Sequence, residues 1–313
     1  MGRRRNKRSA EQLDGLLILN KPSGPTSADC LNDIKHQLKQ FKIGHGGTLD
    51  PLAQGVLLVL LGNGTKLAPY LTGGTKTYSG TFKLGITTDT LDIQGEVVKE
   101  SPVDVQPADV EREILYWKEL TEQEVPAYSA AKYKGKPLYA LAREGLETPV
   151  KTKPIVISHV EALDVNLPEA AFRVSCSAGT YIRSLVHSLG TRMGCGAALT
   201  SLVREASEPF RLEQAFDLED VLENPELFPE RVIPLRDTLP HWPRYRLTEP
   251  LAGLVMNGSW LPVNDQPDTM LAGEIGDQAM LLGPDDEPLA LVEAKLQDGK
   301  PRWAILRGLW NRD

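Results

Sequence analysis

The sequence has few cysteines and no long apolar run. Its three cysteines, Cys30, Cys176 and Cys195, form no CxxC or Cys/His pattern, so we expect neither a disulfide framework nor a structural zinc site and interpret all three as small buried residues. The longest apolar run, Val56 to Gly62, is far shorter than the roughly 20 residues of a membrane helix. The basic N-terminus also lacks the apolar stretch of a signal peptide. These absences predict a cytoplasmic protein without a membrane partner.

Basic residues are also in the minority, and the net charge is -7. Such a charge argues against a phosphate-rich partner, which Lys and Arg largely hold. The distribution removes that objection. Residues 1–10 carry five basic groups and no acidic one, and residues 11–204 are almost neutral; residues 205–298 hold 20 acidic against 6 basic groups. Residues 1–10 therefore predict either a flexible solubilising tail or an arm that contacts nucleic acid.

The regular strand and helix alternation of a doubly wound sheet is missing too. Residues 11–240 mix strand and helix patterns irregularly, which predicts an α+β domain with a mixed, largely antiparallel sheet. From about residue 240, short strand-like pieces separated by Gly, Pro and Asp predict a small all-β domain over residues 245–313. No internal repeat or coiled-coil heptad is present.

Local patterns predict several elements of the larger domain. An apolar run before Pro22 predicts a buried strand, and Ser27 is expected to cap the helix that follows it. Thr180 is expected to cap a second helix, which ends near Gly194. The segment from Ile43 to Gly55 is too rich in Gly and Pro for a regular element, so we expect a loop between two core elements.

This loop, GHGGTLDPLAQG, has the residue types of an active site. Its glycines allow close approach to a ligand, Pro51 restricts the direction of Asp50, and His45 supplies a flat polar ring. The alternative is a tight structural loop in which Asp50 only caps the backbone. No GK[ST] follows, which excludes a phosphate-binding P-loop, and one His with one Asp is too few ligands for a metal.

Five motifs in register resemble one family. They are NKPSGPTS (20–27), GHGGTLDPLAQG (44–55), KTYSGTFKLGITTDTLDIQG (76–95), VPAYSAAKYKGKPLYALAREG (125–145) and CSAGTYIRSLVHSLG (176–190). Their order and spacing closely resemble the TruB family of bacterial tRNA pseudouridine-55 synthases. The resemblance is dense over residues 14 to about 210. Farther on, the layout around MNGSWLPV looks like a PUA RNA-binding domain.

The resemblance implies three residues in catalysis. Asp50 is the catalytic aspartate, Tyr78 stacks on the flipped uracil, and Arg183 pairs with the Asp50 carboxylate. An arginine at ion-pair distance favours the charged carboxylate, which suits a nucleophile at the sugar or a base that removes a ribose proton. The residues leave the choice between these two roles open.

The resemblance also implies contacts around the uridine. His45 fills the space that the flipped nucleotide leaves, and Tyr181 and Leu202 line the uridine site. Asp92 supports the arginine and tyrosine network, and Lys21 is expected as a structural or ribose-side contact. These residues form the substrate-binding set.

The implied reaction is the isomerisation of uridine 55 in the T loop of tRNA. It needs no cofactor, because the base is detached from N1 and rejoined through C5 without net oxidation. The implied partner is the T arm of tRNA, with no obligate protein partner, and the expected state is a monomer. Lys132, Lys134 and Lys136 are candidate phosphate contacts, although a lysine cluster in a loop is also typical of solvated surface.

Two positions depart from the family pattern. Gly46 replaces a more usual Thr, which removes a hydroxyl, and Val203 replaces a common Arg, which leaves Arg204 alone and puts one phosphate contact in doubt.

Three other functions compete with the implied one. They are a non-catalytic RNA-binding or tRNA-folding protein, a guide-RNA-dependent relative within an assembly, and a glycoside hydrolase that would use Asp92 as its second carboxylate. Intact Asp50, Tyr78 and Arg183 argue against the first, and the compact chain with its short basic extension argues against the second.

Overall fold

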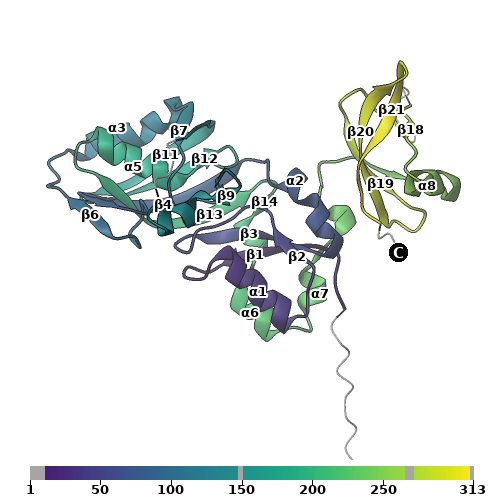
Figure 1. Cartoon of the computed structure of the whole chain (residues 1–313), viewed down its shortest axis with the longest axis horizontal. Helices are drawn as coiled ribbons and strands as arrows, with labels where there is room; N and C mark the ends of the chain where they lie inside the picture. The colour runs from purple at the N-terminus through teal and green to yellow at the C-terminus, as the bar shows by residue number, and fades with distance from the viewer. Residues whose placement is uncertain (1–10, 147–150, 265–270, 311–313) are drawn as a thin grey trace, which may run out of the picture.

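The computed structural model describes residues 11–146, 151–264 and 271–310. It contains a large mixed sheet covered by helices and a smaller curled sheet formed by the C-terminal part of the chain (Figure 1). This arrangement confirms the α+β class. The basic residues 1–10 lie outside the described residues, so their expected role stays a prediction.

The large sheet follows the order β11-β12-β4-β13-β3-β1-β15, with β2, β14 and β16 paired at its margins. Its main strands are β1 (Gly15–Lys21), β3 (Gln54–Leu61), β4 (Lys76–Leu84), β11 (Ile157–Asn166), β12 (Glu169–Cys176), β13 (Ala197–Ser207) and β15 (Phe216–Asp217). The marginal strands are β2 (Ile43–His45), β14 (Phe210–Arg211) and β16 (Ile233–Pro234). Most neighbouring pairs are antiparallel, but β13 runs parallel to β3 and β1 runs parallel to β15.

Seven helices accompany this sheet within the described residues: α1 (Ser27–Gln37), α2 (Ala68–Leu71), α3 (Pro107–Leu115), α4 (Leu138–Arg143), α5 (Ile182–Arg192), α6 (Leu218–Glu223) and α7 (Phe228–Arg231). Three small ladders lie beside it: β5 (Ile86–Thr88) with β6 (Val97–Glu100), β7 (Glu122–Glu124) with β10 (Thr152–Pro154), and β8 (Lys132–Tyr133) with β9 (Lys136–Pro137). Helix α4 begins directly after Pro137, which is its N-cap.

The sequence of strand β1 is apolar without alternation because both faces of the strand are buried. Leu17 and Leu19 pack into a core with α1, α5 and the outer strands, whereas Leu16 and Ile18 pack on the opposite face. A strand that is buried on both faces has a continuous apolar run.

Both expected helix caps are wrong. The N-cap of α1 is Thr26, which forms a capping box with Asp29, and Ser27 turns its hydroxyl inward instead. The N-cap of α5 is Tyr181, which makes no side-chain capping bond. Thr180 does not cap the helix, and its hydroxyl donates to the Ser177 carbonyl instead. In both cases the residue that we expected as the cap lies one position away from the N-cap, and its hydroxyl makes a tertiary or turn contact instead.

The smaller sheet consists of β17 (Arg244–Arg246), β18 (Leu261–Pro262), β19 (Gln278–Leu282), β20 (Pro288–Gln297) and β21 (Lys300–Gly308). It also carries helix α8 (Glu249–Met256), which our all-β expectation missed although Thr248 and Pro250 are helix-start residues. None of the helices in the described ranges has both the length and the hydrophobicity needed to span a bilayer.

Candidate active site

Asp50 lies in the loop between β2 and β3. Part of this loop is more regular than the glycine content suggests, because Ile43–His45 pair with β3 as strand β2. Ser27 at the start of α1 holds the loop in place: its Oγ donates to the Leu49 carbonyl at 2.9 Å and accepts from the Leu49 N–H at 2.8 Å. The helix and the loop are therefore fixed to each other through one buried hydroxyl.

Lys21 supports the same loop from β1. Its side chain is fully buried, and Nζ donates to the carbonyls of Pro22 at 2.8 Å, Pro51 at 3.4 Å and Ala53 at 2.8 Å. Burial lowers the pKa of this amine. Of the two roles expected for Lys21, the contacts support the structural one, since all three bonds end on the chain's own backbone.

Arg183 orients the Asp50 carboxylate. Its Nε donates to Asp50 Oδ2 at 2.9 Å, and its two terminal nitrogens donate to the carbonyls of Thr90 at 2.7 Å and Tyr128 at 2.9 Å. The side chain of Arg183 is only 5% exposed, whereas that of Asp50 is 43% exposed. The arginine is thus locked in place, and the carboxylate that it holds remains open to a ligand.

Asp92 is the second acidic neighbour of Arg183. Its Oδ2 lies 3.8 Å from Arg183 Nε, and its Oδ1 accepts from Thr90 Oγ1 at 2.7 Å and from the Gln94 N–H at 3.1 Å. Asp92 is buried. These bonds suit a supporting carboxylate better than the second catalytic acid of a glycoside hydrolase.

A small pocket opens over these groups. It is lined by Asp50, Leu52, Ala53, Asp92, Arg183, Leu199 and Leu202. The pocket therefore brings together four of the residues expected from the sequence, namely Asp50, Asp92, Arg183 and Leu202. Across the described ranges, no group of three or more His, Cys, Asp or Glu side chains could hold a metal ion.

Tyr78 lies on β4 in the same buried cluster as the pocket residues Leu52 and Leu202, although it is not among the residues that line the pocket. It is 8% exposed and directly opposite Arg204 in the β4–β13 register. Burial raises the pKa of the Tyr78 hydroxyl, and the Arg204 guanidinium opposes that rise. The phenol therefore stays protonated and faces a cation.

His45 and Gly46 stand at the other end of the loop. Burial, with a contribution from Arg204, lowers the pKa of His45, so its ring is neutral. The Nδ1 atom is buried without a hydrogen-bond partner. A Cβ added to Gly46 would lie 3.2 Å from the Cβ of Leu58. A threonine at position 46 would therefore fit only if Leu58 moved slightly.

Tyr181 is held by its backbone. The side-chain amide of Gln123 accepts from the Tyr181 N–H at 2.6 Å and donates to its carbonyl at 3.1 Å. Tyr181 is not among the residues that line the Asp50 pocket. Gln123 was missed by the sequence analysis, because nothing in its local pattern distinguishes it from an ordinary strand glutamine.

Arg204 is a residue to which the sequence analysis assigned no role of its own, noting only that Val203 leaves it without a neighbouring arginine. Its side chain is 2% exposed and donates to backbone carbonyls inside the protein. Its place in a strand that is buried on alternate residues is the signal that could have indicated this. Lys132, Lys134 and Lys136, by contrast, are exposed on the β8–β9 hairpin.

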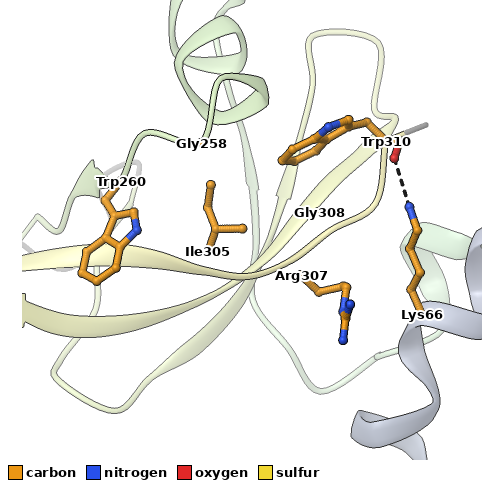
Figure 2. A pocket seen from close by; sticks show the side chains of 7 residues that line it. All are labelled: Lys66, Gly258, Trp260, Ile305, Arg307, Gly308 and Trp310. Carbon is orange, nitrogen blue, oxygen red and sulfur yellow. Dashed lines mark hydrogen bonds between the residues drawn. The ribbon is translucent and has the colours of Figure 1, made fainter. Parts of the chain in front are cut away.

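A second pocket lies where the smaller sheet meets the larger body (Figure 2). It is lined by Lys66, Gly258, Trp260, Ile305, Arg307, Gly308 and Trp310. Lys66 comes from the 3-10 helix η1 (Gly62–Leu67), and its Nζ donates to the Trp310 carbonyl at 3.0 Å. Burial lowers the pKa of Lys66, and Lys42 and Arg307 contribute to this effect.

Comparison with known proteins places this geometry in a family. Residues 35–182 match the model of the N-terminal domain of TruB family pseudouridylate synthases. A protein of Nitratidesulfovibrio vulgaris named tRNA pseudouridine synthase B is 52% identical, over 96% of this chain and 98% of its own length. The chain belongs to the TruB family of pseudouridine synthases. It is therefore an RNA-modifying isomerase.

Further relatives agree with this assignment. A protein of the same name from Oleidesulfovibrio alaskensis is 55% identical over 96% of this chain and 97% of its own length. Among solved structures, an H/ACA ribonucleoprotein bound to a substrate RNA containing 2'-deoxyuridine matches 96% of this chain and 86% of its own chain, with a TM-score of 0.66 and 26% identity. The curled C-terminal sheet is consistent with the PUA-like fold expected for this part of the chain.

Proposed function

We propose that this pseudouridine synthase isomerises uridine 55 in the T loop of tRNA and that Asp50 is its catalytic carboxylate. The observation that carries the proposal is the Asp50–Arg183 pair, in which a buried arginine holds a carboxylate open to a pocket. Highly similar relatives are named for activity on tRNA, which favours tRNA over another RNA.

The chemistry follows from the charge and position of this carboxylate. The N1–C1' bond of uridine breaks, a C5–C1' bond forms, the C5 proton leaves and N1 gains a proton, so atoms and electrons balance without a co-reactant. An ionised Asp50 can attack C1' as a nucleophile or remove a ribose proton as a base. Arg183 serves both routes, because it stabilises the charged carboxylate and fixes its direction.

The base must leave its stack to reach Asp50. Unstacking costs a few kcal/mol, and stacking on an aromatic ring contributes roughly 1 to 3 kcal/mol per base in return. Tyr78 is proposed as that ring, with Leu202 as an apolar wall. His45, with a neutral ring, is proposed to occupy the space left in the RNA. Tyr181 is proposed to line the uridine from the start of α5.

The division of labour along the chain is also proposed. Residues 11–240 would carry the reaction and residues 245–313 would add affinity for tRNA, with residues 1–10 as a flexible basic segment. We expect the enzyme to act in the cytoplasm as a monomer on the T arm, without an obligate protein partner. The ribonucleoprotein neighbour is the reason to consider an assembly, but its identity to this chain is only 26%.

The direct test uses an unmodified T-arm stem-loop and purified protein, without added metal or nucleotide. Pseudouridine is then mapped along the RNA. We expect modification at uridine 55 alone. A matched stem-loop with cytidine at position 55 should stay unmodified. Failure to convert uridine 55 in either the stem-loop or full-length tRNA would refute the assignment of the substrate.

A further inference from the structure

Arg204 is a buried cation in the centre of the large sheet. It lies on β13 with Gly55 of β3 on one side and Tyr78 of β4 on the other. Its guanidinium donates to backbone carbonyls rather than to a carboxylate. A buried charge without a counterion is costly unless its donors are satisfied, so the bonds that Arg204 makes indicate its purpose.

Those bonds end on the loop that carries Asp50 and on strand β3, which follows it. The Arg204 Nε donates to the Val56 carbonyl at 2.7 Å, just after the loop. One terminal nitrogen donates to Gly47 at 3.2 Å and the other to Thr48 at 3.4 Å, just before Asp50. One guanidinium therefore joins the two ends of the loop.

Gly47 and Gly55 show how closely the backbone before and after Asp50 approaches Arg204 of β13. A Cβ at Gly55 would lie 2.3 Å from the Arg204 carbonyl oxygen, and Gly55 has a φ of +98°. A Cβ at Gly47 would lie 3.7 Å from the guanidinium itself. The backbone of the loop is thus fitted around Arg204 on both sides of Asp50.

The same guanidinium also acts on Tyr78. It opposes the burial that raises the pKa of the Tyr78 hydroxyl, and the two residues are direct cross-strand partners. Lys21 binds the middle of the loop, and its pKa is raised by the charge of Asp50 and lowered by that of Arg204. Arg204 is therefore linked to both the Asp50 loop and Tyr78, the two protein groups that we place on either side of the reacting base.

We propose that Arg204 is a positioning residue that sets the Asp50 loop against the Tyr78 ring and makes no contact with RNA. The inference rests on the proposed function. Its side chain is buried, and all three of its nitrogens donate to backbone carbonyls inside the protein, which argues against a phosphate contact. A misplacement of about 1 Å between reacting groups can cost about 100-fold in rate.

The test compares Arg204→Lys and Arg204→Gln with wild type in single-turnover assays at saturating enzyme. We expect the rate to fall about 10-fold for Arg204→Lys, which keeps the charge but not the fork of donors, and at least about 100-fold for Arg204→Gln. The Kd for tRNA should change less than about twofold. Combined with Tyr78→Phe, the rate effects should be less than multiplicative, because both changes disturb one arrangement.

Arg173 provides the matched control. It lies on β12 of the same sheet, is partly exposed and pairs with Glu205 at 2.8 Å. Arg173→Lys and Arg173→Gln should keep the single-turnover rate within about twofold of wild type. A purely structural role for Arg204 would lower the folded fraction without changing the rate per folded enzyme, so each variant is also scored by thermal unfolding and active-site titration.

Hydrogen exchange of the amides of residues 46–53 measures positioning independently of turnover. Exchange should rise in both Arg204 variants and in neither Arg173 variant. Wild-type turnover or unchanged loop exchange in a folded Arg204→Lys protein would overturn the inference, as would a weaker Kd with a salt slope reduced by about one, which is the signature of a phosphate contact. If Arg204→Gln does not fold, Arg204→Lys decides. If wild type makes no pseudouridine, the proposed function fails, and loop exchange still decides the positioning role.

Discussion

Asp50 and Arg183 differ in exposure, and this difference separates the reactive group from the group that orients it. Arg183 is buried and makes three hydrogen bonds, whereas Asp50 keeps nearly half of its side chain exposed. A reactive group must meet its substrate, but the group that orients it need not. The same division applies to Lys21 and Arg204, which are buried and bind backbone carbonyls of the loop.

The ring and the hydroxyl of Tyr78 can be separated by substitution. Tyr78→Phe keeps the stacking surface, so the Kd for tRNA should stay within about twofold, but loss of the hydroxyl that faces Arg204 should slow single turnover at least about tenfold. Tyr78→Leu should weaken both, since stacking contributes roughly 1 to 3 kcal/mol. Because Tyr78 also packs in the core, unchanged rate and affinity in Tyr78→Leu would assign it to packing alone.

Lys76 gives a pH-dependent prediction at the residue scale. Burial, with a smaller contribution from Arg204, lowers its pKa to about 8 from an ordinary 10.5. Between these values the unfolded chain binds a proton that the folded protein does not, so this residue makes stability rise as pH increases. Below about pH 8 both states are protonated and the contribution is constant.

The test of this prediction is denaturant unfolding at pH 7 and pH 9.5. The free energy of unfolding of wild type, relative to that of Lys76→Met, should increase by on the order of 1 to 2 kcal/mol across this range. Lys295→Met, which replaces a lysine that is exposed rather than buried, serves as the control. An equal pH dependence in wild type and Lys76→Met would contradict the assignment.

The sequence indicated the residues that line the site, but not the residues that hold them in place. Asp50, Arg183, Asp92 and Leu202 were expected together and do line one pocket. The roles of Thr90, Tyr128 and Gln123 were not predictable, because they act through main-chain carbonyls or hold another residue's backbone. Such contacts depend on tertiary geometry and leave little trace in a single sequence.

At the scale of elements, the Asp50 loop and the start of β3 each depend on a glycine that no other residue can replace equally. Gly47 and Gly55 both have positive φ, at +103° and +98°. They differ in their surroundings, since a Cβ at Gly47 has free space to 3.7 Å and a Cβ at Gly55 would meet backbone at 2.3 Å.

This difference predicts unequal effects of alanine. Gly47→Ala should reduce the free energy of unfolding by about 1 to 2 kcal/mol through backbone strain. Gly55→Ala should cost clearly more and should also reduce single-turnover rate, because β3 must move away from β13. Thermal and denaturant unfolding check the first effect, and pseudouridine formation checks the second. Equal losses in the two variants would show that steric contact with β13 is unimportant.

The elements themselves were predictable where a pattern was long. Strand β4 and helix α1 have clear apolar periods, and Tyr78, Phe82 and Leu84 of the strand and Cys30, Leu31 and Ile34 of the helix are buried. Short elements were not predictable. The glycine in β2 argues against a strand, and the segments around α8 have strand-like patterns. Pairing with a neighbour, rather than local preference, stabilises elements of this length.

At the scale of the whole molecule, the two sheets share apolar packing. Met280, Leu282, Leu291 and Leu309 of the C-terminal part belong to the same buried cluster as Leu16 and its neighbours. Removal of everything from Leu247 onward would expose this surface, so a truncation would confuse binding with stability. Point substitutions at the second pocket test the proposed affinity role more cleanly.

Arg307 is the exposed cation of that pocket (Figure 2). Arg307→Ala should weaken tRNA binding roughly two- to tenfold and reduce the salt slope of binding by about one, with an unchanged single-turnover rate at saturating enzyme. Lys295→Ala, an exposed cation elsewhere on the same sheet, is the control. A slower rate at saturation with normal affinity would contradict a division between binding and chemistry.

The whole account depends on the charge of Asp50, and Asp50→Asn measures it most directly. The substitution keeps size and loop shape but removes the charge that a nucleophile or base requires. Single-turnover assays with excess enzyme should show pseudouridine formation reduced by at least several orders of magnitude, with tRNA affinity nearly unchanged, because phosphate contacts and stacking dominate binding. If Asp50 only capped the loop, Asn would replace most of its hydrogen bonds at a cost of about 1 kcal/mol. Conversion at more than about a hundredth of the wild-type rate would therefore contradict the catalytic role.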